Sequence, residues 1–163
     1  MDQAERIRCF DDYLAQQRGR LVAIARVYAG NDSEDLLQEI LLQIWKSLDQ
    51  FRELARLETW AYRIAINTSL QWQRSASRKC KHLPSENVDI ASIGRLGSGV
   101  DLADLLDQFL TTLAGTDKAV LVMHLDGLSI SDMADVLGVA EGAVRVRLHR
   151  IKSKVSDWSG EQQ

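Results

Sequence analysis

The sequence predicts an all-α protein made of two small helical domains that are joined by a flexible linker. Its 163 residues suffice for one ordinary domain or two very small ones. Its single proline and ten glycines leave few of the turns that bound strands. Apolar residues recur with helical spacing among good helix formers such as Leu, Ala, Gln, Glu, Lys and Arg, so helices are expected to carry the fold.

Two helices are expected at the start of the chain. The first runs from about Ala4 to Tyr28 and ends at Gly30. The second begins at Ser33, whose hydroxyl can cap it, and acidic residues follow in its first turn. One side of this second helix is apolar at about 100° per residue. That side carries Leu36, Leu37, Ile40, Leu41, Ile44, Trp45 and Leu48.

The opposite face of the second helix is polar and contains one leucine. Leu42 lies there among Asp35, Gln38, Glu39 and Lys46. A leucine ringed by acids and amides suits a docking surface. The pattern alone favours a solvated face instead, because a single exposed leucine is ordinary.

The segment Phe51 to Trp60 leads into a long helix that reaches about Arg78. Two mostly apolar ridges predict packing on two sides: Trp60, Ile64, Thr68 and Trp72 form one, and Tyr62, Ile66 and Leu70 form the other. Between the ridges runs a polar stripe of Arg63, Asn67, Gln71 and Arg74. Guanidinium and amide groups beside aromatic rings are what binding of a single-stranded base requires. Trp60 and Trp72 are interpreted as core residues.

The segment Pro84 to Val100 contains the only proline, with three glycines and three serines, and is the best linker candidate. Four helices are expected after it: Leu102 to Leu113, Asp117 to Leu125, Ile130 to Leu137, and Glu141 to about Trp158. Ser129 and Asp132 form a plausible cap, and Gly138 can end the third of these helices in a left-handed conformation. A short helix, a tight turn and a basic helix together indicate a helix-turn-helix.

The last helix has a predicted core side and a predicted outward side. Val144, Leu148, Ile151 and Val155 form the core stripe. The outward arc carries small and basic residues: Gly142, Ala143, Arg145, Val146, His149 and Arg150. Small residues allow a close approach to a DNA groove, arginine pairs with guanine or phosphate, and an exposed valine can touch a thymine methyl group.

The net charge of −3 and the isoelectric point of about 5.6 argue against nucleic-acid binding when the chain is taken as a whole. The charges are segregated, however. Residues 63–82 and 145–154 each hold five Lys or Arg residues and no acid, and a more acidic stretch lies between them. The average therefore conceals two basic blocks.

Several classes of protein are disfavoured. No run approaches the roughly 20 apolar residues of a membrane span, and the charged N-terminus is not of signal-peptide type, so a cytoplasmic protein without membrane insertion is expected. Cys9 and Cys80 are interpreted as reduced thiols, and no His or Cys cluster has metal-ligand spacing. An enzyme is disfavoured because the acids are scattered and no phosphate-binding loop occurs. The alternative that stays open is a stand-alone helix-turn-helix regulator, although no apolar seam for dimerisation is evident.

Two stretches carry a family resemblance. Asn31 to Arg74, with the motif EDLLQE, looks like region 2 of sigma-70-type factors of the extracytoplasmic-function (ECF) group. Leu113 to Val155 resembles region 4 of the same group. The resemblance implies a region 2 domain at 1–83, a linker at 84–100, a region 4 domain at 101–158 and a tail at 159–163. It also implies a non-enzymatic initiation factor that needs no cofactor, binds core RNA polymerase and promoter DNA, and is held by an anti-sigma factor.

The resemblance assigns roles to individual residues. Docking on core polymerase falls to Asp35, Gln38, Glu39 and Leu42. The resemblance assigns binding of the minus-ten element to Phe51, which starts a loop, and to the polar stripe of Arg63, Asn67, Gln71 and Arg74. Within this stripe, Asn67 matches the family residue that holds a flipped base. The minus-thirty-five element falls to Ala143, Arg145, Val146, His149 and Arg150.

Overall fold

The computed structural model describes residues 2–52, 56–82 and 102–161, and all regular elements within these ranges are helical. Seven α-helices and two 3₁₀ helices make up this part of the chain: α1 (Gln3–Ala29), a 3₁₀ helix (Gly30–Asp32), α2 (Ser33–Ser47), a 3₁₀ helix (Leu48–Gln50), α3 (Leu57–His82), α4 (Leu102–Thr111), α5 (Gly115–Leu125), α6 (Ile130–Leu137) and α7 (Glu141–Glu161). The all-α prediction is confirmed. The predicted linker at 84–100 lies outside the described residues.

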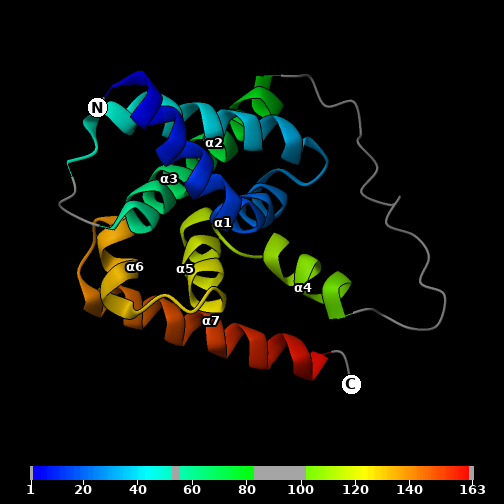
Figure 1. Ribbon diagram of the computed structural model, residues 1–163. Helices are drawn as coiled ribbons and strands as arrows, with labels where there is room; N and C mark the ends of the chain where they lie inside the picture. The colour runs from blue at the N-terminus through cyan, green and yellow to red at the C-terminus, as the bar shows by residue number, and fades with distance from the viewer. Residues whose placement is uncertain (1, 53–55, 83–101, 162–163) are drawn as a thin grey trace.

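The helices α1, α2 and α3 pack on one another and form one half of the molecule (Figure 1). The predicted apolar side of α2 faces inward, because Leu36, Ile40 and Ile44 are all buried. Helix α1 adds Leu21 and Ile24 to the same core, and α3 adds Ile66. The 3.6-residue spacing of apolar residues therefore accounts for this half of the fold.

The start of α2 differs from the prediction. Ser33 does not cap the helix, because it already has helical backbone angles (φ −61°, ψ −31°), whereas a capping residue takes extended ones. The chain turns at Gly30, which has φ of 52° and ends α1, and then passes through a 3₁₀ helix into α2. The prediction for Gly30 is confirmed and that for Ser33 is wrong, since the 3₁₀ turn moves the start of α2 away from any extended residue.

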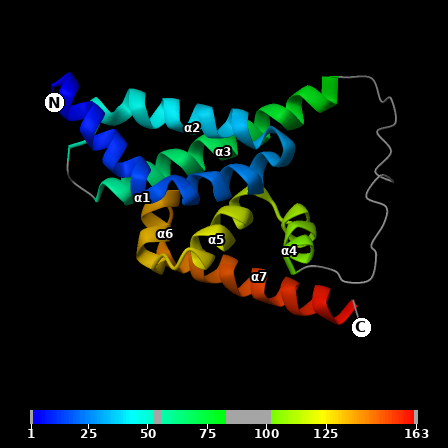
Figure 2. The same ribbon diagram turned by 45° about the vertical axis from the view of Figure 1, so that its right-hand side comes forward.

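The helices α5, α6 and α7 form the second half, and α4 lies on the side of α5 that is remote from α6 (Figure 2). The Ser129 hydroxyl accepts a hydrogen bond from the Asp132 amide at 3.1 Å and so caps α6. Gly138 ends that helix in the left-handed conformation with φ of 66°. Both local predictions for the helix-turn-helix are confirmed.

The core side of α7 is shorter than predicted. Val144, Leu148 and Ile151 are buried, but Val155 is 42% exposed, so its assignment to the core is wrong. Helix α7 continues past the ends of α5 and α6 (Figure 1), so these two helices cover only its earlier turns. A periodic pattern shows which side of a helix is apolar but not where the neighbouring helices stop.

One apolar core runs through both halves. Its buried members extend from Tyr13, Leu21 and Ile24 on α1 to Met123 on α5 and Ile151 on α7. Helix α3 packs against α5 and α6, and α1 packs against α5. The two halves are therefore in direct contact in this conformation.

Candidate functional site

The outer face of α2 carries the residues that the sequence assigns to docking. Asp35, Gln38 and Leu42 are exposed, and Glu39 is partly exposed. Leu42 shows 43% of its surface, and Glu39 accepts a hydrogen bond from Gln43 Nε2 at 2.7 Å. Their spacing of three and four residues places them on one side of the helix, opposite the buried leucine and isoleucines. The structure thus presents an apolar side chain within a polar surface, which is the arrangement expected of a docking face.

The polar stripe of α3 is also at the surface. Arg63, Asn67, Gln71 and Arg74 are all exposed, whereas the intervening Tyr62 and Ile66 are buried. Trp60 and Trp72 are partly buried and pack against the core, in agreement with their interpretation as core residues. The helix therefore packs through its apolar ridges and places its polar stripe at the surface.

A groove of about 380 Å³ lies between side chains of α2 and α3. Its lining includes Glu39 from the docking face and Gln71 from the stripe, together with Trp72. The two predicted surfaces of this half are thus adjacent.

Phe51, which was expected to start a loop, packs against the body of the protein. It is partly buried, and its ring centroid is 5.2 Å from that of Trp60 at an angle of 51°. The contact is worth about 0.5–1.5 kcal/mol beyond the buried area. In this conformation Phe51 therefore packs on the start of α3.

The outward arc of α7 is exposed along its length. Val146 shows 60% of its surface, and Ala143, Arg145, His149 and Arg150 are exposed around it. Arg145 forms an ion pair with Glu141 one turn earlier, at 2.9 Å. This face combines small, apolar and cationic groups with the width of a helix that fits a major groove.

A buried carboxylate supports α7 from behind, and the sequence gave no sign of it. Asp117 on α5 is 7% exposed and accepts a hydrogen bond from Arg147 at 3.0 Å. It also lies 3.9 Å from Arg150, which the sequence assigned to DNA. Asp117 was predicted only to begin a helix, and no local pattern links it to residues 30 positions away.

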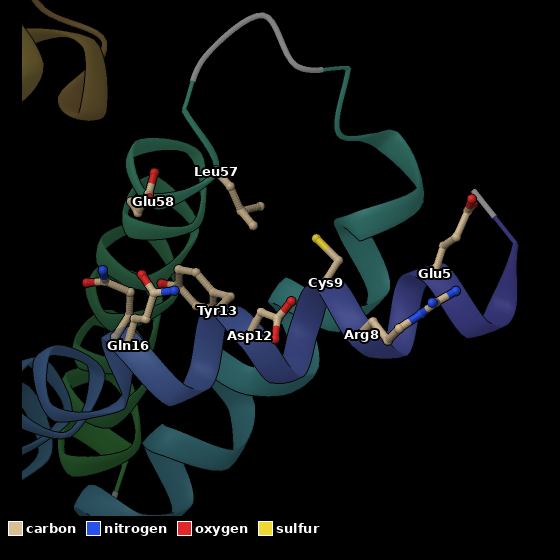
Figure 3. A pocket seen from close by; sticks show the side chains of 9 residues that line it. Glu5, Arg8, Cys9, Asp12, Tyr13, Gln16, Leu57 and Glu58 are labelled. Atoms are coloured by element: carbon tan, nitrogen blue, oxygen red, sulfur yellow. The ribbon is translucent and has the colours of Figure 1, made fainter.

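A separate hollow of about 470 Å³ lies between α1 and the beginning of α3 (Figure 3). Cys9, Tyr13 and Leu57 line it, and carboxylates of Glu5, Asp12 and Glu58 surround them; Arg8, Gln16 and Gln17 complete the lining. Burial raises the pKa of Tyr13 to about 12, so its phenol stays protonated at neutral pH. None of the residues assigned to polymerase or DNA lines this hollow.

Other kinds of site were also considered. Within the described ranges, no three His, Cys, Asp or Glu side chains lie close enough together to hold a metal ion. In the same ranges, no helix combines the length and hydropathy that crossing a membrane requires. His124 is exposed on α5.

Comparison with protein families gives two matches in the order that the sequence suggested. Residues 14–79 match the description "Sigma-70 region 2". Residues 103–155 match "Sigma-70, region 4". The first match contains the docking face and the α3 stripe, and the second contains the helix-turn-helix.

Curated relatives have the same description along most of the chain. ECF RNA polymerase sigma factor SigM of Mycobacterium tuberculosis is 28% identical over 154 residues, which cover 93% of this chain and 77% of the relative. The ECF RNA polymerase sigma-E factor of Escherichia coli is 26% identical over 150 residues, or 82% of this chain and 77% of the relative.

Solved structures share the fold. The sigma factor RpoE of Bartonella quintana, in complex with the anti-sigma factor NepR, has a TM-score of 0.72 and 23% identity, with 91% of this chain and 94% of that chain covered. CnrH, in complex with the cytosolic domain of CnrY, has a TM-score of 0.69 and 22% identity, with 96% and 90% covered. Members of the family are not enzymes. The chain belongs to the sigma-70 family and is an ECF RNA polymerase sigma factor that directs transcription initiation.

Proposed function

We propose that α2 docks this sigma factor on core polymerase through Asp35, Gln38, Glu39 and Leu42. The supporting observation is the exposure of Leu42 in the middle of a polar helix face, opposite the buried Leu36, Ile40 and Ile44. A half-exposed leucine loses contact with water when a partner covers it, and the surrounding polar groups then fix the orientation of that partner.

The α3 stripe binds the opened minus-ten element in this proposal. Pulling a base from the stack costs a few kcal/mol. Asn67 can offset that cost through hydrogen bonds to the extruded base, while Arg63, Gln71 and Arg74 contact the DNA strand on either side of that base. Phe51, at the start of the loop before α3, also contacts the minus-ten element. The α7 face, with Ala143, Arg145, Val146, His149 and Arg150, enters the major groove at the minus-thirty-five element and sets the position.

The division of labour can be tested with two substitutions. Asp35→Ala is expected to weaken core binding about tenfold, because it removes a charge from the docking face. Asn67→Ala is expected to lower run-off transcription about tenfold and to leave core affinity within twofold, because α3 contacts DNA. Core affinity is measured by titration with labelled polymerase, and initiation by mapping transcripts from a genomic library.

Two exposed residues outside these faces provide matched controls. Asp11→Ala removes an exposed carboxylate from α1, and Gln108→Ala removes an exposed amide from α4. Both controls should behave as the wild type. Equal losses of core affinity in Asp35→Ala and Asn67→Ala would contradict the division, and tight sequence-specific binding by an isolated dimer would favour a stand-alone regulator.

An anti-sigma factor is proposed as a further partner, and the cytoplasm as the location. One solved structure quoted above contains a sigma factor in complex with an anti-sigma factor, and the other contains CnrH in complex with the cytosolic domain of CnrY. The expected observation is a native complex in which a second protein co-elutes with this chain and blocks its binding to core polymerase. Elution of the native protein only with polymerase or alone would contradict this partner.

A further inference from the structure

The beginning of α1 lies beside the end of α2, at the place where the chain leaves α2 for Phe51 (Figure 1, Figure 2). Arg6 of α1 bridges the two helices. Its Nη1 donates a hydrogen bond to Asp49 Oδ2 at 2.6 Å, and its Nη2 donates to the carbonyl oxygen of Trp45. Its guanidinium carbon also lies 4.2 Å from the centroid of the Trp45 ring. These three residues, Arg6, Trp45 and Asp49, are called the Arg6 cluster below.

The first turn of α1 is built so that Arg6 is held in place. Asp2 Oδ1 accepts a hydrogen bond from the Glu5 amide at 2.7 Å, and Glu5 Oε2 accepts one from the Asp2 amide at 3.0 Å. This reciprocal cap fixes the turn that Arg6 directly follows. One turn later, Phe10 packs edge-on against Trp45, with ring centroids 5.3 Å apart at 70°. Arg6 and Phe10 therefore contact the same indole from one helix.

The contacts of Arg6 suit a guanidinium better than an ammonium. A planar fork reaches two acceptors at once and stacks on an aromatic ring, whereas an ammonium is a single point charge. The Trp45 carbonyl belongs to the last turn of α2, where the helix dipole favours a cation. Within the described residues, the buried Nε of Arg6 has no hydrogen-bond partner. Such an unpaired buried donor is uncommon, and a requirement for the other contacts of the same guanidinium accounts for it.

The Arg6 cluster lies directly before Phe51. Asp49 is the middle residue of the 3₁₀ helix Leu48–Gln50. The Phe51 amide donates a hydrogen bond to the carbonyl of the buried Leu48 at 3.1 Å. A 3₁₀ helix of three residues has little stability of its own, so an anchored Asp49 fixes the backbone from which Phe51 departs.

The ring of Phe51 is fixed from the other side by α3. It packs on Trp60, which lies three positions before Arg63, the first residue of the polar stripe. The Arg6 cluster holds the backbone of Phe51 and Trp60 holds its ring. Together these contacts set where Phe51 lies relative to the stripe.

The exposure of Asp49 separates a positioning role from a stabilising one. The Asp49 side chain is 52% exposed and that of Arg6 is 20% exposed. Water screens a pair of this kind, so the ion pair contributes little to the stability of the whole chain. The cluster also contains none of the four docking residues of α2. Its loss should therefore affect Phe51 more than folding or core binding.

We propose that Arg6 is a positioning residue for the minus-ten element: by holding Asp49 and the end of α2, it places Phe51 beside the α3 stripe. The sequence assigns no role to Arg6, because its partner lies 43 positions away and leaves no periodic signal. What Phe51 does at the DNA rests on the proposed function. The hold of Arg6 on Phe51 does not.

Fluorine NMR of the free full chain tests this hold without DNA. The chain has three phenylalanines, which are replaced by 4-fluorophenylalanine, and Phe51→Leu assigns the Phe51 resonance. Arg6→Gln and Asp49→Ala are each expected to move that resonance toward the value of an unpacked ring. The resonance of Phe109, which is buried in the core, should stay in place.

Two exposed residues of α1 provide matched controls. Arg8→Gln removes a guanidinium that donates to the Ala4 carbonyl within α1 at 3.3 Å and lines the hollow in Figure 3. Asp11→Ala removes an exposed carboxylate. Both should leave the Phe51 resonance unchanged. An unmoved Phe51 resonance in Arg6→Gln and Asp49→Ala would overturn the hold, and equal movement of the Phe109 resonance would show a general loss of structure and overturn it too.

Transcription from two forms of one promoter tests the consequence. One template is fully paired, and the other carries mismatches that open the minus-ten element beforehand. Arg6→Gln and Asp49→Ala should lose at least about fivefold on the paired template and stay within about twofold on the opened one, because mismatches remove the cost of unstacking. Core affinity should stay within about twofold of the wild type in both variants. Arg6→Lys keeps the charge without the fork and should lose less than Arg6→Gln.

The possible failures are distinguishable. Equal losses on both templates would overturn the positioning role. Full activity of Arg6→Gln on the paired template, together with a loss in Phe51→Ala, would overturn the role of Arg6 and leave that of Phe51 intact. Full activity of Phe51→Ala on the paired template would count against the proposed function of Phe51 instead, while the NMR result still decides whether Arg6 holds it.

Discussion

Asp117 is a buried acid that contacts α7 from behind its exposed face. Its carboxylate is buried on α5 and faces two arginines of α7, at 3.0 Å from Arg147 and 3.9 Å from Arg150. Because Arg147 is partly exposed and Arg150 mostly so, water screens the pair and limits its contribution. The hydrogen bond to Arg147 nevertheless ties α7 to α5 behind the DNA-reading face.

Asp117→Ala is expected to lower the free energy of unfolding by about 1–3 kcal/mol, because it leaves two cations against a buried site without their acceptor. The measurement is the shift in the midpoint of urea unfolding. Asp135→Ala on α6 removes an exposed carboxylate and should change the stability by less than about 0.5 kcal/mol. Equal shifts in the two variants would show that Asp117 makes no special contribution.

For individual residues, the sequence predicted which side chains are exposed better than it predicted which side chains form hydrogen bonds with each other. Leu42 was recognised because an apolar side chain in a polar face is a local signal. Tyr62 was placed correctly in an apolar ridge, but its hydroxyl bonds to Asp126, which is 64 positions away. No helical periodicity carries information about such a partner.

The first helix of the helix-turn-helix depends on its cap. Helix α6 has only eight residues, so intrinsic helix stability is small and the cap contributes a large share. Ser129 satisfies the amide of Asp132, and its hydroxyl donates in turn to Asp132 Oδ2 at 2.6 Å.

Ser129→Ala is therefore expected to destabilise the C-terminal half by about 1 kcal/mol. Ser131→Ala, at an exposed position within the same helix, provides the control and should be nearly neutral. The measurement is hydrogen exchange of the α6 amides, which should accelerate about fivefold in the first variant only. Unchanged protection in Ser129→Ala would refute the role of the cap.

At the level of elements, every predicted helix was found, and the errors lie at the ends. Helix α5 begins at Gly115 rather than Asp117, and α3 begins at Leu57 and continues to His82. Ser33 failed as a cap because a 3₁₀ turn intervenes, and Val155 failed as a core residue because α7 runs on past the ends of α5 and α6. Helix ends are set by neighbours and by turn geometry, which apolar spacing does not report.

Across the molecule, the net charge of −3 conceals a basic α7 face and a polar α2 face with exposed acids. Affinity for duplex DNA comes largely from phosphate neutralisation, which a net negative protein achieves poorly when alone. In the proposed function, core polymerase adds its own contacts and brings both basic blocks to one promoter.

The free protein is therefore expected to bind promoter duplex at least tenfold more weakly than the complex with core polymerase at about 150 mM salt. Fluorescence anisotropy of a labelled promoter, with and without polymerase, measures the difference. Polymerase alone on the same duplex is the control. Comparable affinity of the free chain and the complex would show that charge segregation does not restrain DNA binding.

The unbroken apolar core has a thermodynamic consequence. Because buried side chains of α1–α3 and α5–α7 pack in one cluster, neither half can melt without exposing the other. Scanning calorimetry should show a single heat-absorption peak for the wild type, with equal calorimetric and van't Hoff enthalpies. Two peaks in the wild type would mean that the halves melt as separate cooperative units despite their contact.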